Sequence, residues 1–397
     1  MPRFPLSALL LACPTFAQTY VVDVNVGPGF DFQQIRGAIP QVPDGATLLV
    51  RSGTYAPFQV DGKAITILAE PGATVRLGGL FPEPVQFLNG SPTQRMVLRG
   101  IELPWQLVVQ NCAGPVHIED VKIAPDSLQG SASTPYFLAF RCDQLFVRGL
   151  ENSGTSDVIY SDAVFEDCRL SGRDATTMFS STYTAAPGLV VTDSDVAIVG
   201  CDIDGGAGLL PGTGPALPPS PALLATGARL RLLGPTVATA GAANGAGTAP
   251  ALGLQYSSPP MDVPTDPQVQ LVTAHPTVAD PEFQLDVRPL PHATGQSAGV
   301  GATLTASAPG PIGQFVILVV GLPGAPILLP GIDNAFWLDP VVSAWAAVGV
   351  PQAGAPLSAS ATIPNSASFR GLIVGWQSLT QGPNGLEASN PAWTLVQ

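Results

Sequence analysis

A short apolar pattern recurs five times between residues 97 and 204, and it constrains the fold more than any other feature of the chain. Each copy aligns on a glycine or aspartate, with apolar residues two positions before this anchor and one and three positions after it, except at Asn152. Apolar residues at every second position are typical of β-strands. Because the anchors are 18 to 33 residues apart, the pattern predicts an all-β solenoid of stacked parallel coils. The copies are VLRGIEL (97–103), HIEDVKI (117–123), FVRGLEN (146–152), FEDCRLS (165–171) and IVGCDID (198–204), and the anchors are Gly100, Asp120, Gly149, Asp167 and Gly200.

The positions between these apolar columns carry charges whose sign alternates from one copy to the next. One such column lies one residue before the anchor, and the other lies two residues after it. Strands of neighbouring coils lie ~4.8 Å apart, so each charge is expected to have opposite charges above and below it. We expect both ladders to face solvent, where each pair contributes only ~0–1 kcal/mol. The columns are Arg99, Glu119, Arg148, Glu166, Val199 and Glu102, Lys122, Glu151, Arg169, Asp202.

Composition favours turn-rich β-structure and excludes other classes. Of the 397 residues, 43 are glycine and 42 are proline, which disfavours long helices. The chain has 16 Lys and Arg against 29 Asp and Glu, a net charge of −13. Nucleic acid is excluded as a partner, because binding its phosphates requires clustered positive charge.

The first 17 residues, MPRFPLSALLLACPTFA, have the features of a signal peptide. Arg3 supplies the positive start, an apolar run follows, and Thr-Phe-Ala forms a small-x-small cleavage site. The alternative is lipid attachment at Cys13, since Leu-Leu-Ala-Cys is similar to a lipobox. No later segment reaches the ~18 apolar residues of a membrane span. We therefore expect a secreted or cell-surface protein without a transmembrane segment.

Four cysteines follow the predicted signal peptide. An even number of cysteines in an exported protein suggests disulfides. Cys168 and Cys201 share an inward column in consecutive coils, and Cys112 and Cys142 lie eight and seven residues before their anchors. We expect Cys112–Cys142 and Cys168–Cys201 bonds, with a buried stack of free thiols as the alternative.

The chain is expected to form two domains after residue 17. The solenoid spans 18–279, with irregular Gly-, Ala- and Pro-rich coils at 205–262. In 280–397, apolar strands alternate with Gly and Pro turns, which predicts a β-sandwich. Only four residues after 292 are charged, so we expect no catalysis there. Its tryptophans suit either the sandwich core or a platform that stacks on sugars. They are Trp337, Trp345, Trp376 and Trp393.

Two segments resemble known families. The opening, VVDVNVGPGFDFQQIRGAIPQVPDGATLLVRSGTYAPFQVDGKAITILAEPGATVRL, resembles the start of the pectin lyase-like superfamily, which includes pectin methylesterases. This resemblance implies a right-handed parallel β-helix. It also implies two reaction types: a lyase with a basic residue and Ca²⁺, or an esterase with two carboxylates and an arginine. The C-terminal region is similar to an uncharacterised module of large secreted bacterial proteins, through Ile363-Pro364, Leu372 and Ala388-Ser389-Asn390.

The esterase resemblance supplies the candidate catalytic residues. FEDCRLSGRDATTMF (165–179) resembles the strand that leads to the first catalytic aspartate, which would be Asp174, and Asp195 would be the second carboxylate. Arg173 stands where the family has glutamine, and Asp174 follows its strand whereas Asp195 precedes the next one, so the two need not meet. Acidic residues that suit Ca²⁺ are Asp193, Asp195, Asp202 and Asp204.

We expect a secreted, non-catalytic β-helix protein that binds extended polysaccharide along the solenoid. One alternative is a polysaccharide lyase or a pectin methylesterase-like enzyme, and another is a structural or adhesive surface protein. Apart from the calcium candidates, we expect no cofactor. The three histidines, His117, His275 and His292, lack zinc-site spacing.

Overall fold

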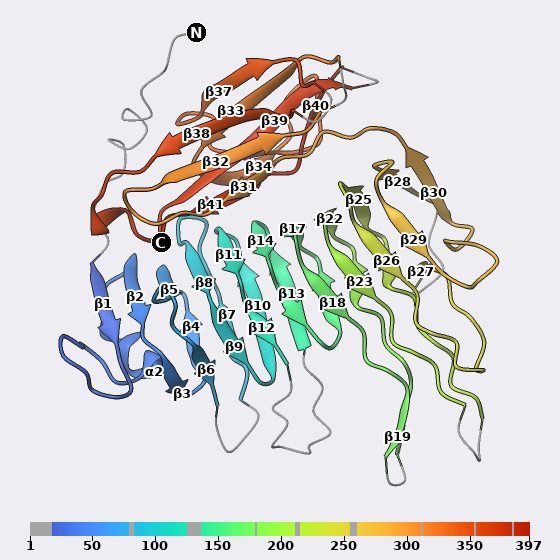
Figure 1. Ribbon diagram of the computed structural model, residues 1–397, viewed down its shortest axis with the longest axis horizontal. Coiled ribbons are helices and arrows are strands. Elements are labelled where there is room, and N and C mark those ends of the chain that lie inside the picture. The colour runs from blue at the N-terminus through green and yellow to red at the C-terminus, as the bar shows by residue number, and fades with distance from the viewer. Residues whose placement is uncertain are drawn as a thin grey trace.

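The computed structural model describes residues 18–78, 83–124, 136–178, 181–210, 215–254, 260–310, 313–352, 355–382 and 385–397. The predicted signal peptide and the alternative lipid site at Cys13 lie outside these ranges. The described chain is all-β, and most of it winds into a parallel β-helix, as the repeats predicted (Figure 1).

Three long parallel sheets form the solenoid, and each full coil contributes one strand to sheet 3, then to sheet 1, then to sheet 2. Sheet 1 contains β1 (Thr19–Val22), β2 (Ala46–Val50), β5 (Ile65–Ala69), β8 (Met96–Arg99), β11 (Val116–Glu119), β14 (Leu145–Arg148), β17 (Asp162–Glu166), β22 (Asp195–Val199), β25 (Arg229–Leu233), β28 (Met261–Thr265) and β30 (Phe283–Val287). Sheet 2 contains β3 (Gly53–Tyr55), β6 (Val75–Leu77), β9 (Ile101–Leu103), β12 (Lys122–Ile123), β15 (Glu151–Asn152), β18 (Arg169–Ser171), β23 (Asp202–Asp204), β26 (Val237–Thr239) and β29 (Gln270–Val272). Sheet 3 contains β4 (Gln59–Asp61), β7 (Val85–Leu88), β10 (Gln106–Cys112), β13 (Tyr136–Cys142), β16 (Ser156–Ile159), β21 (Leu189–Thr192), β24 (Leu223–Thr226) and β27 (Leu252–Leu254).

The glycine and aspartate anchors form the corner between sheets 1 and 2. All five have positive φ angles, between 53° and 73°. This left-handed conformation favours glycine and, among other residues, aspartate and asparagine. The alternation of glycine and aspartate among the anchors therefore follows from the backbone of a repeated corner.

The strand register confirms both predicted charge ladders. In sheet 1, Arg99 is opposite Glu119, Glu119 opposite Arg148, and Arg148 opposite Glu166. In sheet 2, Glu102, Lys122, Glu151, Arg169 and Asp202 follow one another in the same way. Apolar side chains of all three sheets fill the inside of the coil.

Two smaller elements depart from the coil. The helix α2 (Ile35–Ala38) packs against β2 near the N-terminal end of the solenoid, with Ile35 and Ala38 buried. The hairpin of β19 (Thr176–Met178) and β20 (Ser181–Tyr183) projects from the connection that follows β18 (Figure 1).

Antiparallel sheets follow the solenoid. The first contains β31 (Thr294–Gln296), β32 (Thr303–Ala308) and β38 (Leu357–Thr362). The second contains β35 (Ile332–Asp333), β40 (Gly385–Ala388), β39 (Ile373–Gly382), β33 (Val316–Gly321), β37 (Ala344–Gly349) and β41 (Ala392–Leu395), and a separate pair joins β34 (Pro323–Ile327) to β36 (Phe336–Leu338). Residues of β32, β33, β38 and β39 share one apolar core around Trp376. The last strand of the solenoid sheets, β30, lies just past residue 279, the boundary expected from the sequence.

The four cysteines correct a prediction, because all are buried free thiols. Cys112 and Cys142 are in register on adjacent strands, as expected. Strand spacing is ~4.8 Å, whereas a disulfide requires Cβ atoms about 3.5–4.5 Å apart. Each thiol instead donates to a carbonyl of the preceding coil, for example Cys142 to Val109 at 3.5 Å and Cys201 to Phe165 at 3.5 Å. The aligned sulfurs therefore satisfy the backbone without a covalent bond between them.

Candidate functional site

The predicted catalytic residues lie at different corners of the coil. Asp195 is the first residue of β22, at the corner between sheets 3 and 1, where it pairs with Arg229 at 3.0 Å. Asp174 follows β18 of sheet 2, and its Oδ1 accepts a hydrogen bond from the amide of Ala207 at 2.7 Å. Arg173 donates to the carbonyl of Thr184 at 3.2 Å. The structure therefore gives each residue its own local partner and does not assemble an esterase site from them.

The calcium candidates are divided in the same way. Asp193 and Asp195 lie between sheets 3 and 1, whereas Asp202 and Asp204 lie on β23 of sheet 2. Within the described ranges, no group of three or more Asp, Glu, His or Cys side chains is arranged to hold a metal ion.

Asp162 is an acidic residue that the sequence analysis did not select. It is in register with Asp195 on the neighbouring strand. Burial, together with the negative charges of Asp195 and Asp143, raises the pKa of Asp162 to about 6. Arg229 pairs with Asp195 and offsets part of this effect.

The outer face of sheet 1 is covered by the C-terminal domain (Figure 1), which corrects the expectation that its ladder faces solvent. Glu119, Arg148 and Glu166 are 3%, 8% and 1% exposed. The apolar part of the contact joins solenoid residues to Leu290 and to residues of the second sheet and β36. The solenoid members are Leu49, Leu68, Val97, Phe146, Val164, Ala197, Val199 and Leu233, and the C-terminal members are Leu290, Trp337, Ile373, Trp393 and Leu395.

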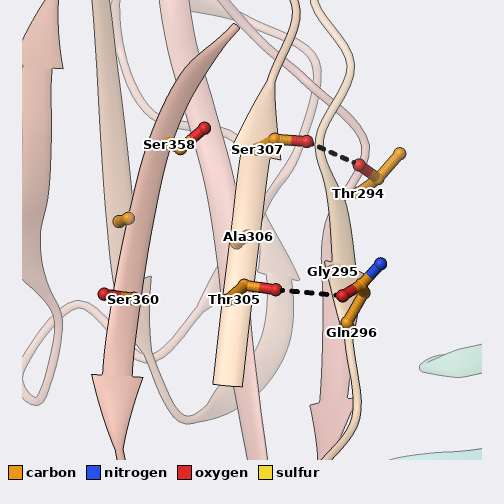
Figure 2. Close-up of a pocket in the computed structure, with 9 residues that line it drawn as sticks. Thr294, Gly295, Gln296, Thr305, Ala306, Ser307, Ser358 and Ser360 are labelled. Carbon is orange, nitrogen blue, oxygen red and sulfur yellow. Dashed lines mark hydrogen bonds between the residues drawn. The ribbon is translucent and has the colours of Figure 1, made fainter. Parts of the chain in front are cut away.

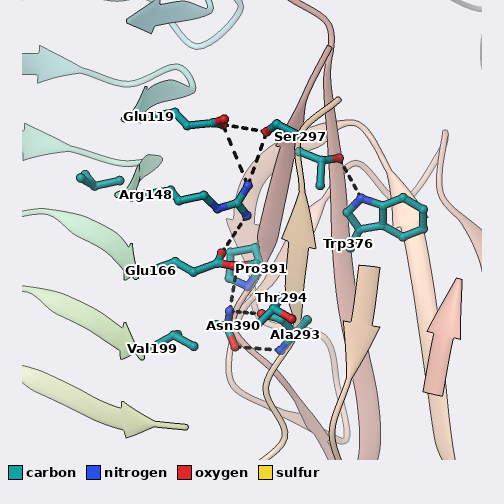
Figure 3. Close-up of polar contacts among 12 residues, drawn as sticks. Glu119, Arg148, Glu166, Val199, Ala293, Thr294, Ser297, Trp376, Asn390 and Pro391 are labelled. Atoms are coloured by element: carbon teal, nitrogen blue, oxygen red, sulfur yellow. Dashed lines mark hydrogen bonds and ion pairs between the residues drawn. The ribbon is translucent and has the colours of Figure 1, made fainter. Parts of the chain in front are cut away.

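A buried ion array crosses this contact (Figure 3). Arg148 lies 3.0 Å from the carboxylate of Glu166 and 3.9 Å from that of Glu119. Glu119 also accepts from Arg99 at 3.1 Å and from the Ser297 hydroxyl of the C-terminal domain at 2.8 Å. The solenoid ladder is thus completed by a residue almost 180 positions later in the chain.

The two buried glutamates differ in protonation. Both are desolvated, which raises their pKa values. For Glu119, hydrogen bonds from His117 and Ser297 and the charge of Arg148 outweigh burial and lower the pKa to about 2. For Glu166, burial outweighs the attraction of Arg148 and raises the pKa to about 7. Glu119 is therefore ionised near neutral pH, whereas Glu166 titrates there.

His117 extends the array into an aromatic stack. Its ring lies 5.4 Å from Phe146 and 6.2 Å from Trp393, nearly parallel to both. Burial lowers the pKa of His117, so the ring is neutral. Because Nε2 lies 2.8 Å from the carboxylate of Glu119, which only accepts, we assign the ring proton to Nε2. His117 is therefore a structural contact between the domains.

A second surface lies on the outer face of sheet 3, and sequence analysis missed it. Phe140 of β13 and Tyr160, which follows β16, have ring centroids 5.9 Å apart. Arg141 lies over the ring of Phe140 at 5.0 Å, and the Tyr136 hydroxyl donates to Asp157 at 2.5 Å. We call these five residues the sheet 3 patch. Its sequence signal is the alternation in YFLAFR, which precedes the region that was aligned on the anchors.

The sheet 3 patch combines apolar rings with polar groups. Tyr160 is 52% exposed, Arg141 is exposed, and Tyr136, Phe140 and Asp157 are half-buried. Partial burial raises the pKa values of Tyr136 and Asp157, and their mutual hydrogen bond fixes both side chains. The patch therefore offers two aromatic rings, inclined at 78° to each other, beside fixed hydrogen-bonding groups.

The tryptophans of the C-terminal domain do not form one platform. Trp337, Trp376 and Trp393 are at most 3% exposed and belong to apolar cores, whereas Trp345 is 69% exposed on the edge strand β37.

Comparison of the chain with protein-family models, curated proteins and solved structures found no match. Over the described ranges, no helix has the length and apolar character to cross a membrane.

Proposed function

We propose that this protein is exported and binds extended polysaccharide along the outer face of sheet 3 without cleaving it. The observation that carries the proposal is the sheet 3 patch, where Phe140 and Tyr160 come from adjacent coils and stand beside Asp157 and Arg141. Flat aromatic faces suit the faces of sugar rings, and fixed polar groups suit their hydroxyls.

The solenoid geometry supports an extended ligand. Coils repeat at ~4.8 Å, so equivalent positions of neighbouring strands form a continuous surface along the axis. Outer-face residues of adjacent coils on both sides of the patch add further polar side chains. Gln59, Gln86, Gln106 and Gln110 precede it, and Thr192 and Thr226 follow it.

The charge of the chain favours a neutral polysaccharide. The net charge is −13, which repels polyanions at long range. Arg141 is the one cation of the patch, and it already lies over Phe140. The resemblance of residues 21–77 to pectin lyase-like proteins supports a carbohydrate ligand in general.

The absence of cleavage is proposed from the separation of the candidate residues. Asp174 and Asp195 belong to different corners of the coil, and Asp195 is paired with Arg229. Incubation with neutral glucans, xylans, pectins and alginates, followed by product analysis, tests this part. Release of shorter or unsaturated products would contradict it.

Binding is tested by affinity electrophoresis of the full chain in gels that contain each polysaccharide. We expect retardation by a neutral polysaccharide, and weaker retardation of the double variant Phe140→Ala/Tyr160→Ala. Phe315→Ala is the matched control, because Phe315 is a 55% exposed aromatic residue of the C-terminal domain. Equal retardation of the wild type and the patch variant would place binding elsewhere.

A further inference from the structure

A groove crosses the three-stranded sheet of the C-terminal domain (Figure 2). It has a volume of about 380 Å³, within the range of ligand sites. Its floor is the row Gly295, Ala306 and Ala359, which are aligned across β31, β32 and β38. Ala306 packs its methyl group into the core behind the sheet, so the groove is floored largely by backbone.

Two rows of short polar side chains border this floor. The rows are separated by two residues along each strand, which corresponds to ~6.8 Å. They consist of Thr294, Ser307, Ser358 and of Gln296, Thr305, Ser360.

Two pairs of side chains in the groove are held in place by hydrogen bonds to each other. Thr294 and Ser307 share a hydrogen bond of 2.9 Å, and Thr305 donates to Gln296 at 3.3 Å (Figure 2). Behind the sheet, Leu304, Ala306 and Ala308 are buried. Such preorganisation reduces the entropy lost on binding.

The buried ladder of the solenoid also fixes β31. Ser297, directly after this strand, donates to Glu119 at 2.8 Å. A Cβ at Gly295 would lie 2.5 Å from Thr394, so only glycine permits this close approach. One end of the groove is therefore anchored on the contact between the domains.

We propose that this groove binds a single chain of a neutral polysaccharide. Its lining has hydroxyl and amide groups that donate and accept hydrogen bonds, and it has no charged side chain. The uncharged lining disfavours polyanions, whose binding requires cations, and the polar rows disfavour an apolar peptide. A neutral, hydroxyl-rich chain matches both properties.

This site goes beyond the proposed function, because it uses no residue of the sheet 3 patch. Binding to both sites by one long polymer would raise the overall affinity above that of either site. Short oligosaccharides separate the two contributions, since they occupy one site at a time.

The test uses isothermal titration of the full chain with hexasaccharides of β-1,4-linked glucose, xylose or mannose. The variant Thr305→Val/Ser360→Ala removes hydroxyls on adjacent strands of one wall. The matched control is Thr303→Val/Thr362→Val, which changes a facing hydroxyl pair of the same strands outside the groove. We expect at least tenfold weaker binding for the groove variant and no change for the control. Circular dichroism and a melting curve verify that each variant is folded.

Phe140→Ala/Tyr160→Ala, measured alongside, distinguishes the two proposals. If the groove variant binds the hexasaccharide more weakly than the wild type and the patch variant binds it equally well, the groove is supported and the sheet 3 site is contradicted. If only the patch variant binds the hexasaccharide more weakly, the inference about the groove is overturned and the proposed function stands. Should the groove variant fold poorly, Ser307→Ala replaces it and is expected to weaken binding severalfold. No hexasaccharide binding by the wild type, or equal loss in groove and control variants, overturns the inference.

Discussion

The two charge ladders of the solenoid have the same alternation of charge and different surroundings. The ladder of sheet 2 is exposed, with Lys122 and Glu151 side chains 55% and 57% accessible and 3.3 Å apart. The ladder of sheet 1 lies under the C-terminal domain, where Arg148 and Glu166 are 3.0 Å apart and almost inaccessible. The sequence pattern specifies which charges are neighbours, whereas the covering domain determines what each pair contributes to stability.

The difference follows from solvent. Water screens the exposed pairs, so each contributes ~0–1 kcal/mol. In the covered ladder, each charge has lost hydration and depends on its partners, so removing one partner leaves a buried charge uncompensated.

The largest expected effect comes from removing the central cation of the covered ladder. Arg148→Met should lower the free energy of unfolding by about 3–5 kcal/mol, because Glu119 and Glu166 both contact Arg148. The matched change in the exposed ladder, Lys122→Met, should alter it by about 0.5 kcal/mol or less. Urea denaturation of the full chain measures both. Equal effects would show that the sheet 1 ladder is not covered.

The aromatic contact between the domains gives a second comparison. Trp393→Ala should cost about 3–5 kcal/mol, because this buried ring stacks on Phe146 at 5.4 Å and on His117. Trp345→Ala removes an exposed ring and should cost about 0.5 kcal/mol or less. Denaturation monitored by circular dichroism avoids the change in fluorescence that each substitution causes. A small cost at Trp393 would argue against the stacked contact.

The pH dependence of stability provides a third comparison. Burial raises the pKa of Glu166 to about 7, so the folded chain holds a proton that the unfolded chain releases above its ordinary pKa of 4.5. The contribution of Glu166 to stability is therefore present at low pH and is lost as the pH rises to about 7, by up to about 1.4 kcal/mol per pH unit.

The variant Glu166→Gln isolates this effect, because glutamine stays neutral. The unfolding free energy of the variant, relative to the wild type, should increase between pH 5 and pH 7 and level off above pH 8. Glu151→Gln is the exposed control, because the Glu151 side chain is 57% accessible. A flat difference for Glu166→Gln would show that Glu166 is ionised throughout this range.

The smallest effect is expected in the exposed ladder. Lys122→Glu would place a negative charge between Glu102 and Glu151 and should cost up to about 1 kcal/mol at low ionic strength. Salt at about 0.5 M should remove most of this cost by screening. The measurement is urea denaturation at two salt concentrations. A cost that persists in high salt would indicate that this face is also covered.

The register of the coils could be predicted because the corners repeat. The Gly and Asp anchors share one left-handed backbone conformation, which fixed the alignment of both ladders. The sequence also contains a pattern that indicates the covering of sheet 1 by another part of the chain. The second outward column of that sheet is mostly apolar, including Val97, Phe146 and Val164, so its strands are apolar on both faces. Near-continuous apolar strands are typical of parallel sheets buried on both sides.

The candidate site was harder to predict. Asp174 and Asp195 are separated by about one coil, a spacing that any solenoid produces between residues at different corners. The sheet 3 patch depends on strands that lie before the aligned segments, so no anchor placed Phe140 beside Tyr160. The prediction of two disulfides was wrong for a geometric reason, because adjacent strands align the thiols without bringing them to bonding distance.

The most direct test of the account is a pair of double-mutant cycles, one in each ladder. Arg148→Met and Glu166→Gln form the covered cycle, and Lys122→Met and Glu151→Gln form the exposed one. At pH 8, where Glu166 is ionised, the coupling energy should exceed about 1.5 kcal/mol for the covered pair and stay below about 1 kcal/mol for the exposed pair. Coupling energies that agree within error would contradict the claim that the C-terminal domain covers sheet 1 and determines the energetics of its charges.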